Sequence, residues 1–156
     1  MTVPYEIAQY RRADQEDVVQ FLRAVLGELG FDFNPDEKDE DLRHIPDVYH
    51  SNAGVFLLAR HQAHVVGTIA LRQIAQSTCE LKRFYVRKDH RRRGLGTALL
   101  DTVIAHAKAG SWKNLRLDTT SKSPAAISLF RKHGFVEIVR YNDDPFAEIF
   151  MELSLR

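Results

Sequence analysis

Hydrophobic residues follow two different periods along this chain. Apolar side chains recur every three or four positions in residues 15–29, 99–107 and 124–133, and each run ends at or near a glycine. This spacing predicts three amphipathic helices. A shorter helix is predicted to pass through Leu42 and Ile45 and to end before Pro46, because the residue before a proline disfavours helical geometry.

The remaining apolar segments are short and rich in strand-forming residues. The connection 61–64 between two of them is short enough to predict an antiparallel hairpin. The resulting order, β-α-α-β-β-β-α-β-α-β-β, predicts an α/β fold with a mixed, mostly antiparallel sheet, about four helices and at least one crossover connection. The predicted strands are 5–10, 55–60, 65–71, 80–87, 115–118, 135–141 and 149–155.

A basic segment with two glycines lies between the strand at 80–87 and the helix at 99–107. A helix start leaves backbone N–H groups without partners and carries positive partial charge, and glycine lets an anion approach those groups. Arginine adds donors suited to phosphate oxygens. The segment therefore predicts a site for a pyrophosphate-bearing ligand. It consists of Arg91, Arg92, Arg93, Gly94, Leu95, Gly96 and Thr97.

Three phosphate-binding patterns compete for this segment with a plain basic turn. A Walker A loop requires a Gly-x-x-x-x-Gly-Lys-Ser/Thr string, which the chain lacks, and a dinucleotide fingerprint requires a third glycine where Leu99 stands. The third pattern, Arg-x-x-Gly-x-Gly, is matched by Arg91, Gly94 and Gly96. The alternative without a ligand is a tight turn with a solvated basic face.

Composition narrows the possible function classes. A chain of 156 residues fits one domain spanning residues 1–156, and its net charge of +1 does not favour nucleic acid as a partner. A lone cysteine, Cys79, with no export signal and no apolar run of spanning length, predicts a cytoplasmic protein without a membrane partner. The scattered histidines, among them His61 and His64, predict no metal site.

Three motifs together resemble the GNAT superfamily of N-acetyltransferases. They are the strand at 80–86, the Arg91-x-x-Gly94-x-Gly96 segment, and a final helix that reads Ser123-x-x-Ala126-Ile127-x-Leu129-Phe130-x-x-x-Gly134-Phe135. The predicted order of elements is also the GNAT order. The resemblance covers nearly the whole chain, including the ending from Tyr141 to Leu153, and implies a small GNAT acetyltransferase of bacterial type.

The resemblance implies that acetyl-CoA is the cosubstrate and that residues 91–97 bind its pyrophosphate. It implies that Phe84, Tyr85 and Val86 line the pantetheine arm, with Val86 offering a backbone N–H to the thioester oxygen, and that Ser123 and Phe130 border the same site. The family often has asparagine at the position of Ser123. It often has tyrosine at that of Phe130, where it protonates the departing thiolate, which a phenyl ring cannot do.

Proton transfer is assigned to two other residues. Glu80 matches a strand glutamate that acts as the general base in some family members; the alternative is a surface or salt-bridged glutamate. Without a bulge, alternation would place Glu80, Lys82, Phe84 and Val86 on one face of their strand. Tyr141 ranks first as the replacement acid, ahead of Tyr85 and Ser123.

Several functions stay open at this point. The leading hypothesis is transfer of acetyl from acetyl-CoA to the primary amine of a small molecule or an amino acid. The alternatives are a protein or peptide N-acetyltransferase, a non-catalytic acyl-CoA-binding module, and a nucleic-acid-binding domain. A homodimer is compatible with the resemblance. The acidic segment 34–41 is interpreted as a solvated face or as an attractor for a cationic amine.

Overall fold

The structure is a computed structural model that describes residues 5–156. Residues 1–4, which belong to the segment inspected for an export signal, lie outside the described residues. Short 3-10 turns occupy Arg12–Asp14, Glu40–Arg43 and Lys88–His90. The helices are α1 (Gln15–Glu28), α2 (Ile45–Tyr49), α3 (Leu95–Ala109) and α4 (Pro124–Lys132). The strands are β1 (Glu6–Gln9), β2 (Val55–His61), β3 (His64–Ala75), β4 (Thr78–Val86), β5 (Asn114–Thr119), β6 (Val136–Ile138) and β7 (Ile149–Ser154).

The strands form one sheet in the order β1-β2-β3-β4-β5-β7-β6. All neighbouring pairs are antiparallel except β4 and β5, which are joined by the crossover through α3. The predicted mixed α/β sheet and its order of elements are therefore confirmed. The β2–β3 hairpin closes through Gln62 and Ala63, both with positive φ, a geometry whose twist matches that of the paired strands.

Two predicted boundaries are wrong. The strand predicted at 135–141 is only β6 (Val136–Ile138), so Tyr141 lies in the segment that follows it. Pro46 was expected to follow a helix, but it lies in the first turn of α2, where proline's missing N–H costs no hydrogen bond. Leu42 belongs instead to the preceding 3-10 turn, whereas Ile45 begins α2.

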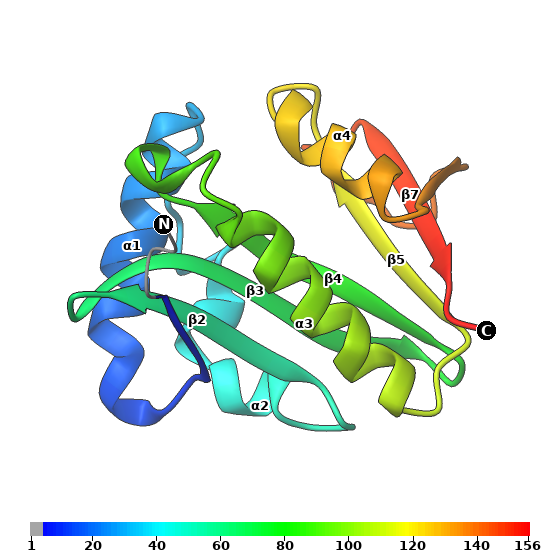
Figure 1. Ribbon diagram of the computed structural model, residues 1–156, viewed down its shortest axis with the longest axis horizontal. Coiled ribbons are helices and arrows are strands. Elements are labelled where there is room, and N and C mark those ends of the chain that lie inside the picture. Colours follow the sequence, from blue (N-terminus) through cyan, green and yellow to red (C-terminus); the bar gives the residue numbers. More distant parts are fainter. Residues whose placement is uncertain (1–4) are drawn as a thin grey trace.

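Helices cover both faces of the sheet and divide the core in two (Figure 1). Side chains of α3 and α4 pack in one cluster with alternate sheet residues, and side chains of α1 and α2 pack in the other. On β2, Leu57 faces the α3 side and Phe56 and Leu58 face the α1 side, so this strand is apolar throughout. In the described part of the chain, no helix is both long enough and apolar enough to cross a membrane.

A β-bulge interrupts β4. Thr68 of β3 pairs with Tyr85 and Ala70 pairs with Lys82, so two residues of β4 oppose a single residue of β3. Arg83 lies in this bulge with φ of 54°, in the left-handed region that is unfavourable for a non-glycine residue. The Thr68 hydroxyl donates a 2.7 Å hydrogen bond to the Arg83 carbonyl and holds the distortion.

The bulge overturns the expected alternation along β4. Leu81, Phe84 and Val86 pack with the α3 cluster, whereas Tyr85 packs with the α1 cluster. Glu80 does not share a face with Phe84 and Val86, because the extra residue reverses the alternation between them.

The acidic segment fixes the bulge. The Arg83 guanidinium donates hydrogen bonds to Asp39 at 2.9 Å and to Asp41 at 3.0 and 2.6 Å, and the Tyr49 hydroxyl also donates to Asp41. Asp39 and Arg83 side chains are only 2% and 9% exposed. Because Asp39 and Asp41 form a buried ion pair with Arg83, they are neither part of a solvated face nor attractors of a cationic amine, the two interpretations given above for residues 34–41. We call Arg83, Asp39 and Asp41 the bulge clasp.

The pairing between β4 and β5 ends shortly before the bulge. Their parallel ladder covers only Thr78 to Glu80 opposite Asn114 to Arg116. Beyond it the two strands separate, as Figure 1 shows, and the chemistry of the site is built around this opening.

We expect Arg83→Leu to lower the free energy of unfolding by about 3–5 kcal/mol, because it removes the cation of Asp41 and leaves Asp39 with Lys38 alone. Urea unfolding followed by circular dichroism measures this. Arg43→Leu is the matched control, since Arg43 pairs with Asp36 at 2.8 Å with side chains 54% and 75% exposed. Losing such an exposed pair should cost about 0–1 kcal/mol.

The cost should also depend on pH. Burial raises the pKa of Asp41, but the hydrogen bonds and charge of Arg83 outweigh burial and hold that pKa below its usual value. The contribution is therefore present above the unfolded pKa of about 3.9 and is lost as pH falls through the lower folded value. The difference in the free energy of unfolding between wild type and Arg83→Leu should decrease below about pH 4. A difference that stays constant at acidic pH would contradict this account.

Candidate active site

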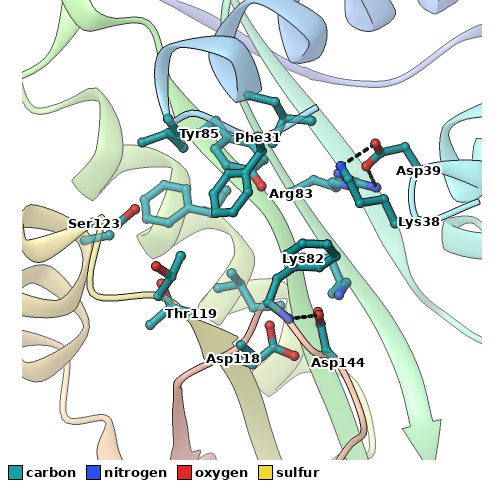
Figure 2. Close-up of a pocket in the computed structure, with 18 of the residues that line it drawn as sticks. Phe31, Lys38, Asp39, Lys82, Arg83, Tyr85, Asp118, Thr119, Ser123 and Asp144 are labelled. Atoms are coloured by element: carbon teal, nitrogen blue, oxygen red, sulfur yellow. Dashed lines mark hydrogen bonds and ion pairs between the residues drawn. The ribbon is translucent and has the colours of Figure 1, made fainter. Parts of the chain in front are cut away.

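A cavity of about 460 Å³ fills the opening between β4 and β5. Figure 2 shows Phe31, Tyr85 and Ser123 around one end of it and Lys82, Asp118 and Asp144 around the other. Its walls come from β4, the end of β5, the start of α4, the segment after α1, and the loop before β7.

The predicted phosphate segment forms the turn into α3. Arg92 and Gly94 have positive φ, of 63° and 82°, and Gly94 is the N-cap residue of the helix. A side chain at Gly94 would be strained in this geometry. The first-turn amides of α3 lack intrahelical partners and are therefore available to an anion.

The residues at the start of α3 have different surroundings. Leu95 is 1% exposed and packs into the core, so it can meet a ligand only through its backbone. Gly96 lies beside apolar side chains: a Cβ there would lie 3.5 Å from Leu129 and 3.6 Å from Phe84. Thr97 is exposed in the first turn of α3.

The three arginines also differ. Arg91 Nε donates a 3.0 Å hydrogen bond to the Val86 carbonyl, and its guanidinium lies 3.6 Å from Glu28 of α1. Arg92 and Arg93 are exposed, and no ion pair joins either of them to another residue in the described part of the chain. These two guanidinium groups are available to phosphate oxygens, whereas Arg91 braces the turn.

Aromatic side chains form the apolar wall. The rings of Phe84 and Phe130 lie 5.7 Å apart, and Phe130 lies 5.6 Å from Phe135. Phe130 is 3% exposed and lines the cavity, so the position where the family often has tyrosine contributes only hydrocarbon. Ser123 is the N-cap residue of α4 and also lines the cavity.

Glu80 and Tyr141, far apart in sequence, meet in an adjoining hollow. The Tyr141 hydroxyl donates a 2.7 Å hydrogen bond to Glu80 Oε2, and Arg72 donates to Oε1 at 2.9 and 3.1 Å. Glu80 is only 2% exposed. Burial raises the pKa of Tyr141, and the negative charge of Glu80 raises it further.

Three polar residues line both the cavity and this hollow: Lys82, Asp118 and Asp144. Sequence reasoning missed Asp118, which accepts a 2.7 Å hydrogen bond from Asn142. Burial raises its pKa, and Glu80 and Asp144 add to the shift, against the opposing effects of Lys82 and Asn142. Its place near the end of β5, beside the predicted crossover, is the signal that could have identified it.

Other candidate chemistry is weak. Burial raises the pKa of the Cys79 thiol to about 12, so this sulfur is a poor nucleophile. Within residues 5–156, no three His, Cys, Asp or Glu side chains gather in a way that could hold a metal ion.

Comparison with known proteins identifies the family. The model of the "Acetyltransferase (GNAT) family" matches residues 19–135. An uncharacterized N-acetyltransferase of Schizosaccharomyces pombe is 26% identical, over 91% of this chain and 89% of that protein. The IAA acetyltransferase of Azospirillum brasilense is 32% identical, over 90% of this chain and 92% of that protein.

A solved structure agrees with both relatives. The crystal structure of a GNAT-family acetyltransferase from Staphylococcus aureus superimposes with a TM-score of 0.91, at 26% identity, over 98% of this chain and 100% of that one. This chain therefore belongs to the GNAT acetyltransferase family. It is an acyltransferase whose cosubstrate is acetyl-CoA, and structures with this fold hold coenzyme A or acetyl-CoA.

We expect Gly96→Asp to abolish measurable acetyl-CoA binding by calorimetry. A carboxylate about 4 Å from a phosphate costs about 4 kcal/mol at a protein surface, roughly a thousandfold in affinity. Gly96→Ala is the control, because its Cβ would meet neighbours only at ordinary contact distances and should leave most of the affinity. Unchanged affinity in a folded Gly96→Asp protein would rule out this placement of the phosphates.

Proposed function

We propose that this protein transfers acetyl from acetyl-CoA directly to the primary amine of a small molecule or an amino acid. The supporting observation is the two-ended opening between β4 and β5. One end has the apolar wall of Phe84 and Phe130, which suits the cofactor, and Phe84 lies beside the first turn of α3 at Gly96. The other end holds Lys82, Asp118 and Asp144, which suit a polar acceptor.

The size of the acceptor is limited by the side chains that close the cavity. Phe31, which follows α1, and Phe146, in the loop before β7, meet edge to face with ring centroids 6.1 Å apart. Their contact joins two segments across the cavity and bounds it at about 460 Å³. A compact amine fits this volume better than a folded protein surface does.

The proposed reaction requires no covalent enzyme intermediate. The ammonium of the acceptor loses one proton, and the neutral nitrogen then attacks the thioester carbonyl. The new N–C bond forms as the C–S bond breaks, and the nitrogen loses its second hydrogen as a proton. One proton leaves to solvent and the other ends on the thiol of coenzyme A. A backbone N–H of Val86 would stabilise the developing oxyanion.

In our proposal, the Glu80–Tyr141 pair accepts the proton that the amine loses. Arg72 and Tyr141 already occupy the Glu80 oxygens, so a proton would reach this carboxylate through a water molecule or through the Tyr141 hydroxyl. The same hydroxyl is our candidate donor to the thiolate, because Phe130 has none.

Phe130 favours a second candidate function, a non-catalytic acyl-CoA-binding module. Thiol release from acetyl-CoA, measured across a panel of amino acids, amines and peptides, separates the two. Release that depends on a small amine supports the proposal. Acetyl-CoA binding without release on any acceptor would support the module, and release only with peptides would support a protein acetyltransferase.

Glu80→Gln should lower kcat by about 10² to 10⁴ and weaken the acidic limb of the kcat/KM profile, with acetyl-CoA affinity retained. Glu152→Gln is a matched control, because Glu152 accepts a 2.7 Å ion-paired hydrogen bond from Arg116 but lines neither hollow. If both substitutions lower kcat equally, and thermal unfolding shows that both lose the same stability, the role of Glu80 would be purely structural.

Phe130→Tyr should raise kcat by up to roughly tenfold to a hundredfold if protonation of the thiolate limits turnover. The added hydroxyl would point into the cavity that Phe130 lines. Phe135→Tyr places the same hydroxyl in the adjoining core, outside the cavity, and should not raise kcat. An unchanged kcat in folded Phe130→Tyr would mean that another donor already acts or that another step is slow.

A further inference from the structure

Lys82 and Asp118 project from the same face of the sheet on opposite sides of the opening. Glu80 and Arg116 are direct partners in the parallel β4–β5 ladder. Lys82 and Asp118 follow two residues later on their strands, so each lies on the same face as its predecessor, where the strands have separated. Figure 2 shows both side chains at one end of the cavity.

Lys82 differs from the other basic residues around the two hollows. Each of the others has a carboxylate oxygen within 2.9 Å of a side-chain nitrogen: Lys38, Arg72, Arg83 and Arg116. Among residues 5–156, no carboxylate oxygen lies within 4.0 Å of Lys82 Nζ, and that nitrogen donates no hydrogen bond.

Asp118 is the complementary case. It accepts a hydrogen bond from the neutral amide of Asn142, and within the described part of the chain no basic group lies within 4.0 Å of it. Burial raises its pKa, because removal from water disfavours the charged carboxylate. A ligand carrying one charge of each sign would supply what both residues lack.

The same cavity also has apolar lining. Leu26 and Leu29 line it together with Phe31 and Phe146, and Phe146 remains 50% exposed. An exposed aromatic ring beside a polar hollow can cover the apolar part of a ligand whose charged part lies deeper.

We propose that the acceptor is a free α-amino acid with an apolar side chain, its carboxylate bound by Lys82, its ammonium by Asp118 and its side chain by Phe31 and Phe146. The inference rests on the proposed function and specifies its acceptor. A peptide N-terminus lacks the neighbouring carboxylate. A polyamine would bring a second cation toward Lys82, which costs free energy.

The test compares free leucine and phenylalanine with their carboxamides as acceptors, using thiol release from acetyl-CoA. The amide removes one negative charge at nearly constant shape, and it makes the amine less basic, which works against our expectation. We expect kcat/KM to be roughly tenfold to a hundredfold higher for the acids, the range for a charge-assisted hydrogen bond. We expect aspartate and lysine, which have charged side chains, to be poorer acceptors than leucine.

Variants then locate the recognition. Lys82→Gln should lower kcat/KM for the acid to that for the amide and leave the amide unchanged, while Lys82→Arg should keep the preference. Lys108→Gln, at an exposed position near the far end of α3, is the matched control and should keep the wild-type ratio. Asp118→Asn should weaken both acceptors alike, because it acts on the ammonium that they share.

The outcomes separate this inference from the proposed function. Equal turnover of acid and amide, or a preference that survives in a Lys82→Gln protein that still binds acetyl-CoA, would overturn the acceptor assignment and leave a small-amine acetyltransferase standing. Absence of thiol release with every amine would overturn the proposed function itself. An acid preference that disappears only with Lys82→Gln would support the assignment.

Discussion

The buried ion pair between Arg83 and the carboxylates of Asp39 and Asp41 is the constraint on which the site depends. Arg83 lies in a backbone conformation that costs free energy, and its position is fixed by two aspartates at one end and by Thr68 at its carbonyl. A buried pair of this kind adds little net stability over an apolar alternative, but losing one partner is expensive. We infer that the clasp is retained for the geometry that it imposes on β4.

That geometry has two consequences for the chemistry. The bulge turns Phe84 and Val86 toward α3 and α4 and Tyr85 toward α1, so one strand contributes to both sides of the site. It also coincides with the separation of β4 from β5, whose ladder ends at Glu80. The strand backbones no longer pair with each other beyond that point, which leaves room for a ligand between them.

The features that depend on residues close together in the sequence were predictable from it. Periodicity and glycine positions indicated α1, α3 and α4 and the order of the strands, and the segment from Arg91 to Gly96 indicated the turn into α3. The bulge was not predictable, because it depends on Asp39 and Asp41, more than forty residues from Arg83 in sequence. Asp118 was missed because its environment is created by the β4–β5 opening. The Glu80–Tyr141 contact was not predicted either, although each residue was a separate candidate for proton transfer.

The charges of the site fall into two groups, and the division has a physical meaning. Arg83, Arg72 and Arg116 are held by carboxylates of the chain itself, so they can fix geometry but have little capacity left for a ligand. Lys82 and Asp118 face each other across the opening without such partners. Leaving charges partly desolvated and unpaired costs folding free energy. A binding site recovers that cost only when a ligand of matching charge arrives, so our proposal for acceptor specificity rests on the unpaired groups and not on the well-formed ion pairs.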